Sequence, residues 1–234
     1  MNHESDHKFD RDYREQHWRD AAADPSHHSS ADPSPYLVAA VQALPPGRAL
    51  DAGCGTGGDA VWLAGQGWQV TGADISPTAL AEAAQRAAYA SVSNRTRWVE
   101  ADLTSWEPAE RVDLVLTSYA HPAMPQLAFY QRVAEWVAPG GTLLIVGHTH
   151  PAESDGHHRG HGHHHGHGVD DPDEFAPPEE TLVSVSQITD LLEPALWRIT
   201  LAEERNRSVP TSTGHMELHD VVVRASRRTE APRP

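Results

Sequence analysis

The stretch Ala49-Leu50-Asp51-Ala52-Gly53-Cys54-Gly55-Thr56-Gly57-Gly58 decides the fold of this chain. An apolar run ends in the acid Asp51, and the glycines that follow are too dense for any regular element. A helical pattern begins at once over residues 60–64. We therefore predict a buried strand, a turn whose backbone a ligand can approach closely, and a helix whose N-terminus is aimed at that ligand.

Three kinds of cofactor site compete for this turn. Gly53, Gly55 and Gly58 match the G-x-G-x-x-G pattern of dinucleotide sites, where a helix N-terminus attracts a pyrophosphate. A P-loop needs Lys and then Ser or Thr after its last glycine, but Asp59-Ala60 stand there. A carboxylate at the strand end, here Asp51, repels a pyrophosphate and favours a cation. S-adenosylmethionine, which carries an ammonium and a sulfonium and no phosphate, meets that requirement.

At this point the sequence resembles the class I S-adenosylmethionine-dependent methyltransferases, whose first motif is D-x-G-x-G-x-G. Residues 68–73 are predicted to form a second strand ending in Asp74, where an acid suits the two ribose hydroxyls. A third strand, 96–101, ends in Asp102. In the family resembled, that acid faces the adenine amino group and the amide of Leu103 faces the ring. Helix caps that follow strands would account for one or two of these acids, but hardly for all.

The resemblance implies a cofactor site made of the glycine turn and the ends of the neighbouring strands. Its expected members are Asp51, Gly53, Gly55, Gly57, Asp74, Ile75, Asp102, Leu103 and Thr117.

Regular alternation of strands and helices predicts an α/β fold with a parallel sheet covered on both faces. The sequence patterns predict helices at 36–44 and 185–192. Strands are expected near 48–52, 68–73, 96–101, 112–118, 142–147, 197–202 and 219–224, and helices near 58–66, 77–90 and 125–137. The resemblance implies a seven-stranded, mostly parallel, Rossmann-like sheet whose last strand is antiparallel.

We expect a single methyltransferase domain over residues 36–226, followed by a disordered tail at 227–234. Residues 1–35 are polar and are predicted to be flexible, with a short helix at 9–18. In the family resembled such a segment often closes over the cofactor as a lid; the alternative is a helix packed on the sheet edge. A histidine-rich insertion at 148–180 is expected at the carboxyl edge of the sheet, where ligands bind.

The histidine run in this insertion has a spacing that suits a metal. If the run is extended, side chains alternate, so that one side carries His161, His163, His165 and His167. Four imidazoles are suitable ligands for Zn²⁺, Ni²⁺, Co²⁺ or Cu²⁺. The alternative is a solvated, disordered loop that binds metal only in the test tube.

The acceptor side is predicted to follow the fourth strand, at residues 117–122. Tyr119 and His121 lie where a base or a hydrogen-bonding group can reach a methyl acceptor. In the alternative interpretation, Tyr119 packs under the cofactor and His121 caps the next helix. Amino-adenine methyltransferases carry Asn/Asp-Pro-Pro-Tyr/Phe here and this chain does not, which argues against a nucleic-acid base as acceptor.

The chain of 234 residues has 18 basic and 33 acidic side chains, a formal net charge of −15. That charge argues against a nucleic-acid or anionic-membrane partner. The single cysteine, Cys54, fits a reducing compartment and is expected to be a small filler in the turn. No apolar stretch approaches membrane-spanning length, so we expect a cytoplasmic protein.

Two functions remain open at this point. The first is methyl transfer from S-adenosylmethionine to a small molecule, by in-line displacement onto a soft thiol or metalloid acceptor. The chain looks closest to the bacterial group that includes tellurite-resistance and thiopurine methyltransferases, although the histidine run departs from that pattern. The second is a metal-binding or metal-sensing protein that keeps the methyltransferase fold and uses its histidine-rich loop. The three strand-end acids favour methyl transfer, because a site that no longer binds the cofactor need not keep all three.

Overall fold

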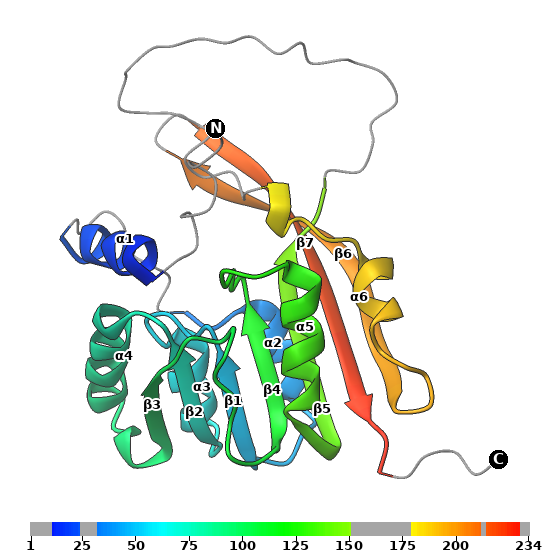
Figure 1. The fold of residues 1–234 in the computed structure, drawn as a ribbon. Coiled ribbons are helices and arrows are strands. Elements are labelled where there is room, and N and C mark those ends of the chain that lie inside the picture. Colours follow the sequence, from blue (N-terminus) through cyan, green and yellow to red (C-terminus); the bar gives the residue numbers. More distant parts are fainter. Residues whose placement is uncertain (1–10, 24–31, 151–178, 212–213, 230–234) are drawn as a thin grey trace, which may run out of the picture.

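The computed structural model describes residues 11–23, 32–150, 179–211 and 214–229. Its centre is a seven-stranded sheet with the order β3-β2-β1-β4-β5-β7-β6 (Figure 1). The strands β1 to β5 run parallel, whereas β7 is antiparallel to both β5 and β6. The strands are β1 (Arg48–Ala52), β2 (Gln69–Asp74), β3 (Thr96–Glu100), β4 (Val112–Ser118), β5 (Val137–His148), β6 (Trp197–Thr211) and β7 (Gly214–Arg227).

Helices cover both faces of this sheet. One face packs against α2 (Pro35–Val41), α3 (Gly58–Gly65) and α4 (Pro77–Tyr89), and the other against α5 (Gln126–Glu135) and α6 (Val185–Asp190). Two single 3₁₀ turns are η1 (Ser93–Arg95) and η3 (Glu179–Thr181). The helix α1 (Arg11–Ala23) lies above the carboxyl ends of the strands, on the side of α4 (Figure 1).

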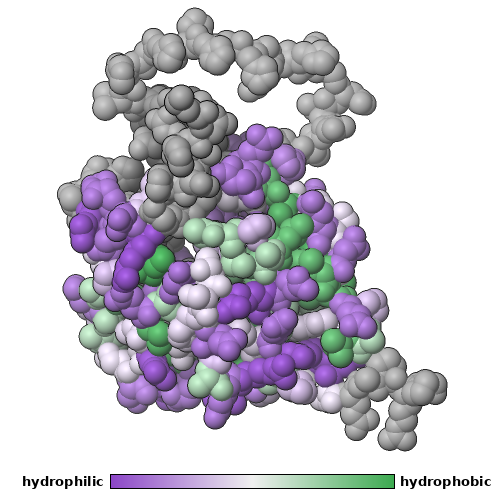
Figure 2. All heavy atoms as spheres, in the orientation of Figure 1, coloured by the Kyte–Doolittle hydropathy of each residue, from purple (hydrophilic) through white to green (hydrophobic). Residues whose placement is uncertain are grey.

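The middle of β4 is apolar because helices bury it from both sides. Leu114, Val115 and Leu116 of β4 have no solvent exposure. Side chains of α5 and α6 pack on one face of the sheet, and those of α2 and α3 on the other. The face shown in Figure 2 is mostly hydrophilic, with a hydrophobic band over the region of α5 and α6.

The predicted sheet is confirmed, including the antiparallel β7. The last two strands form a much longer hairpin than the sequence indicated, with 15 and 14 residues. Its outer part projects beyond the rest of the sheet (Figure 1). In β6 this part contains charged residues such as Glu203, Glu204 and Arg205, which are exposed or half-buried. The alternation of apolar and polar residues that marks a half-buried strand is therefore missing, and the sequence did not indicate the full length of the hairpin.

Local signals place the helix starts that frame the site. Ser76 accepts a hydrogen bond from the amide of Ala79, and Pro77 occupies the first turn of α4. The helix α6 begins with a reciprocal capping box between Ser184 and Gln187.

The two ends of the histidine-rich insertion lie side by side at the carboxyl edge of the sheet. His148 forms a parallel bridge with Leu182, and its carbonyl accepts a hydrogen bond from the amide of Val183 at 3.0 Å. Residues 151–178 lie outside the described residues, as do 1–10 and 230–234 of the two predicted flexible ends. Within the part of the chain that is described, no helix is long and apolar enough to cross a membrane.

Candidate functional site

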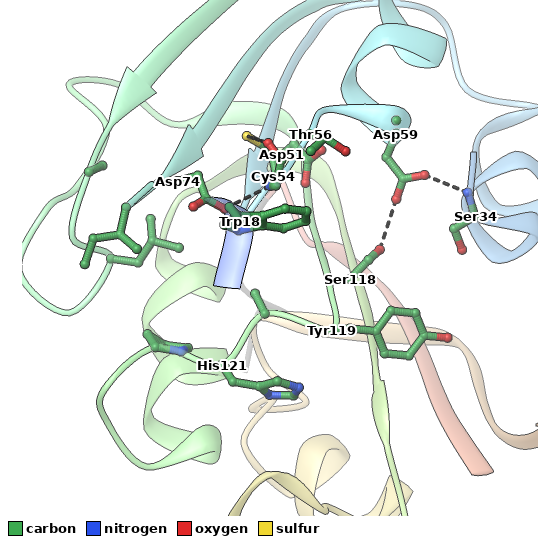
Figure 3. A pocket seen from close by; sticks show the side chains of 18 of the residues that line it. Trp18, Ser34, Asp51, Cys54, Thr56, Asp59, Asp74, Ser118, Tyr119 and His121 are labelled. Atoms are coloured by element: carbon green, nitrogen blue, oxygen red, sulfur yellow. Dashed lines mark hydrogen bonds between the residues drawn. The ribbon is translucent and has the colours of Figure 1, made fainter. Parts of the chain in front are cut away.

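A cavity of about 650 Å³ opens at the carboxyl edge of the sheet. It lies at the switch point between the neighbouring strands β1 and β4, from which the chain continues toward opposite edges of the sheet. Figure 3 shows the acids of the glycine turn on one side of this cavity and Tyr119 and His121 on the opposite side. Most of the predicted site residues line it. They are Asp51, Gly53, Gly55, Asp74, Ile75, Asp102, Leu103, Tyr119 and His121.

The glycine turn has the close backbone approach that its sequence predicts. The amides of Gly53 and Cys54 both donate to the carbonyl of Ala73, at 2.8 and 3.1 Å, which ties the turn to β2. Gly53 has a φ of +82°, and a Cβ atom there would collide with Ala120, which lies directly beside it. A side chain at this position would therefore displace the segment that follows β4.

Two residues predicted to bind the cofactor, Gly57 and Thr117, lie beside the turn and outside the cavity lining. A Cβ atom on Gly57, the left-handed N-cap of α3, would collide with Trp98 and Ala83. Thr117 is buried within β4, with 1% of its surface exposed. Both residues shape the backbone beside the cavity and neither contributes its surface to the lining.

Three carboxylates make one end of the cavity strongly acidic. Asp51 is 2% exposed, and burial together with the charges of Asp59 and Asp74 raises its pKa well above the usual range. Asp74 accepts hydrogen bonds from the amides of Gly55 at 2.8 Å and Ser76 at 3.0 Å. A cation bound here would relieve the repulsion among the acids.

Asp59 is a member of this acidic end that the sequence interpretation missed. It lies in the first turn of α3, lines the cavity, and accepts hydrogen bonds from the Ser34 amide at 2.7 Å and the Ser118 hydroxyl at 3.1 Å. Burial is the main cause that raises its pKa, and these two bonds lower it. Its position directly after Gly58 was a usable signal, since the start of that helix was expected to face the ligand.

The third strand end forms the next wall of the cavity. Asp102 holds a local turn, because its Oδ1 atom accepts from the amide of Thr104 at 2.9 Å and from its hydroxyl at 2.7 Å. The side chain of Arg132 donates to the carbonyl of Leu103 at 3.1 Å and so fixes the same segment from α5. Asp102 and Leu103 therefore lie on a backbone with little freedom.

The helix α1 is fastened over the acidic end. The Glu15 carboxylate accepts hydrogen bonds from the hydroxyls of Ser76 at 2.6 Å and Thr78 at 2.5 Å, at the start of α4. Trp18 lines the cavity, and its ring lies 3.0 Å from where a Cβ on Gly55 would be. The helix α1 thus contacts both the start of α4 and the cavity.

Replacing Glu15 with glutamine is expected to loosen α1 without unfolding the domain. Burial raises the pKa of Glu15, but hydrogen bonds from Ser76 and Thr78 lower it further, so the net pKa is below the usual value. The anchoring is then complete above the unfolded-state pKa of about 4.3 and is lost as the pH falls through the lower, folded-state pKa. We expect amide hydrogen exchange in α1 to accelerate roughly tenfold in Glu15→Gln at neutral pH. Asp20→Asn on the same helix is the control, and equal acceleration in both variants would contradict the anchoring role.

On the opposite side, Tyr119 is held in an uncommon conformation. Its φ is +54°, which a bulky side chain adopts only when its surroundings enforce it. Its hydroxyl donates to Asp220 Oδ2 at 2.9 Å. Burial, and next the charge of Asp220, raise its pKa far above the usual range, so the phenol stays protonated. Tyr119 acts as a hydrogen-bond donor and not as a base.

His121 lines the cavity, and its ring is bonded to a side chain of α5. Its Nδ1 atom lies 3.1 Å from Gln126 Oε1, and the amide group of Gln126 donates to the carbonyl of Ala120 at 2.9 Å. Because that second bond fixes Oε1 toward the imidazole, Nδ1 must carry the hydrogen. The neutral ring therefore has its basic lone pair on Nε2. The contact joins the side chains of His121 and Gln126, the first residue of α5, and the start of this helix has no side-chain capping hydrogen bond.

Cys54 behaves as the filler that the sequence suggested. It is 9% exposed, and burial and the charges of Asp51 and Asp74 raise the pKa of its thiol well above the usual value. The thiolate form that a nucleophile requires is thereby disfavoured.

The predicted metal ligands His161, His163, His165 and His167 lie outside the described residues. Over 11–23, 32–150, 179–211 and 214–229, no group of three or more histidine, cysteine, aspartate or glutamate side chains could hold a metal ion.

Comparison with known proteins agrees with this geometry. Residues 49–141 match a family model described as a methyltransferase domain. A probable thiol methyltransferase 2 from Arabidopsis thaliana is 34% identical over 49% of this chain and 53% of its own length. Thiocyanate methyltransferase 1 from the same plant is 29% identical over 79% of this chain and 74% of its own length. The chain thus spans about half the length of the first of these relatives.

A solved structure described for the conversion of a disulfide bond into a thioacetal group during echinomycin biosynthesis has a similar fold. It is 26% identical, with a TM-score of 0.60, over 87% of this chain and 84% of that chain.

Proposed function

We propose that this chain, whose residues 49–141 match a methyltransferase family model, is a class I S-adenosylmethionine-dependent methyltransferase that transfers a methyl group to a small molecule with a soft sulfur acceptor. The observation that carries the proposal is the cavity itself. Acids at three successive strand ends line one side, and a histidine with a defined basic nitrogen lines the other. Asp51, Asp74 and Asp102 are the strand-end acids.

The residues present fit S-adenosylmethionine. Gly53, Gly55 and Gly57, all with positive φ, keep the turn clear of side chains, and the acidic end suits a ligand with two positive charges. Asp74 would hold the ribose hydroxyls, and Asp102 with Leu103 would border the adenine. When bound, this cofactor supplies a methyl group activated by a sulfonium.

The chain's own residues then have two tasks, to take up a proton and to exclude water. His121 Nε2 accepts the proton of a neutral thiol as the acceptor becomes a thiolate, and Gln126 holds the ring in the required tautomer. Trp18 on α1 covers the glycine turn and limits the access of water. An acceptor that is already ionised needs only the second task.

The choice of sulfur is supported by two relatives named for thiol and thiocyanate acceptors. The experiment is a screen for S-adenosylhomocysteine release with aliphatic thiols, hydrosulfide, thiocyanate, selenite, tellurite and trans-aconitate. Release that is confined to sulfur and related soft acceptors supports the proposal. Turnover on trans-aconitate alone would replace it by a carboxylate methyltransferase, since another relative is named for that substrate.

A metal-binding role for residues 157–168 is a separate proposal, supported by the alternating histidines and by the position of the insertion ends beside the cavity. Deleting 157–168 is expected to abolish high-affinity Ni²⁺ or Zn²⁺ binding and to leave S-adenosylhomocysteine affinity unchanged, because none of the proposed cofactor residues lies in this stretch. Titration calorimetry measures both. Full metal affinity after the deletion would place the ligands elsewhere.

We also propose that the protein is cytoplasmic and has no nucleic-acid partner. They are supported by the single, buried Cys54 and by the net charge of −15. Cell fractionation and a nucleic-acid retention assay at low salt test them.

A further inference from the structure

The acceptor side of the cavity is built around one carboxylate that the chemistry above does not use. Asp220 on β7 has no solvent exposure. Its Oδ2 atom accepts three hydrogen bonds, from Arg207 Nε at 2.6 Å, Tyr119 Oη at 2.9 Å and Tyr36 Oη at 3.0 Å. His148 Nδ1 lies 3.6 Å from the other oxygen. These partners come from four separate parts of the chain and meet at one buried charge.

Arg207 reaches from this buried carboxylate to the cavity. Its side chain is 34% exposed and lines the cavity beside Tyr36 and Tyr119. Its guanidinium carbon lies 5.0 Å from the centre of the Tyr119 ring. Asp220 accepts the hydrogen bond of Arg207 Nε, and the Tyr119 ring packs against the guanidinium. These two contacts fix the orientation of the guanidinium before any ligand binds. The ion pair therefore has its negative end buried and its positive end at the cavity.

This arrangement makes the two ends of the cavity electrostatically different. The glycine-turn end carries the carboxyl groups of Asp51, Asp59 and Asp74, and the other end carries an ion pair whose guanidinium, on Arg207, faces the cavity while its carboxylate is buried. The two tyrosines add no negative charge, since burial raises the pKa of Tyr36 to about 12 and that of Tyr119 further still. A ligand anion is repelled from the first end and attracted to the second, in a partly desolvated site where such interactions are strong.

We propose that Arg207, held by Asp220 and Tyr119, forms an anion subsite that selects a negatively charged acceptor, such as a thiolate or thiocyanate, over an uncharged one. Asp220, Tyr36 and Tyr119 are positioning residues. The proposal rests on the proposed function of the cavity and deepens it by naming the charge of the acceptor. An anion that accepts a methyl cation equivalent becomes neutral, so the product loses its attraction to Arg207 and leaves more readily.

Arg205 provides a matched control for the test. It lies two residues away on the same strand and pairs with Glu203 at 2.7 Å. Thiocyanate binding is measured by titration calorimetry in the presence of saturating S-adenosylhomocysteine, with dimethyl sulfide as the uncharged probe. We expect Arg207→Gln to weaken thiocyanate binding by roughly tenfold or more, the scale of one charge-assisted contact. Dimethyl sulfide binding, and thiocyanate binding by Arg205→Gln, should stay unchanged. Arg207→Lys should recover part of the loss.

The outcomes separate this inference from the proposed function. If the protein does not bind S-adenosylhomocysteine, the proposed function itself fails. If it does, the anion subsite is overturned by any of three results: no thiocyanate binding, full binding by Arg207→Gln, or an equal loss in Arg205→Gln. Asp220→Asn should weaken thiocyanate binding while S-adenosylhomocysteine affinity stays, which supports the positioning role. Where that variant does not fold, the arginine variants still decide.

Discussion

A His121→Ala variant is expected to lose about 10²- to 10⁴-fold in turnover on a neutral thiol while keeping its affinity for S-adenosylhomocysteine. The physical reason is that Gln126 fixes the hydrogen of the ring on Nδ1, which leaves Nε2 to take the thiol proton. Without that base the fraction of thiolate in the site falls to what the solution pH supplies. Steady-state kinetics and calorimetry on the same preparations measure the two quantities.

Thiocyanate provides a stringent comparison, because it is ionised at every working pH and needs no base. The loss in His121→Ala should therefore be small with thiocyanate as acceptor. His219→Ala, a histidine on β7 whose ring contacts Asn206 at 2.9 Å, serves as the matched control. A large loss on both acceptors would show that His121 shapes the pocket or caps α5 and does not accept a proton.

Asp74→Ala is expected to weaken S-adenosylhomocysteine binding by about 1.5–3 kcal/mol, or roughly ten- to a hundredfold in Kd. Two effects add. The variant loses hydrogen bonds to the ligand from a charged acceptor, and it also releases the amides of Gly55 and Ser76, which Asp74 holds at 2.8 and 3.0 Å. The glycine turn therefore loses part of its fixed shape.

Calorimetry with S-adenosylhomocysteine and with NAD tests this prediction. The control is Glu107→Ala, an exposed carboxylate remote from the glycine turn, which should bind as the unmodified chain does. An unchanged Kd in Asp74→Ala, or tight NAD binding by the unmodified chain, would contradict the assignment of the strand-end acids to this cofactor.

The same acids show why the cofactor side could be predicted from the sequence. Asp51 and Asp74 lie at the carboxyl ends of β1 and β2, Asp102 lies just after β3, and parallel strands bring these ends to one edge. Local patterns were therefore enough to place them in one cavity. His121 was found in the same way, as the residue shortly after the fourth strand, although its tautomer depended on a contact with Gln126 that no pattern indicates.

The acceptor end could not be predicted in this way. Tyr36, Tyr119, Arg207 and Asp220 are up to 184 residues apart, and only the antiparallel hairpin brings Arg207 and Asp220 to the cavity. Much of the hairpin sequence is polar and lacks clear alternation, so it gave no sign that its single aspartate would have no solvent exposure. Glu15 was missed for a similar reason, because its partners Ser76 and Thr78 are more than 60 residues away.

By itself, then, the sequence determined the parallel sheet, the glycine turn and the acids that end its strands. Each of these depends on residues that are neighbours along the chain, and strand direction alone gathers them at one edge. The tertiary structure decided the charge at the acceptor end, the contact of α1 with α4 and the tautomer of His121. Those features depend on side chains such as Asp220, Glu15 and Gln126 that acquire their partners only when distant segments pack, because burial and hydrogen bonding are properties of the folded surroundings.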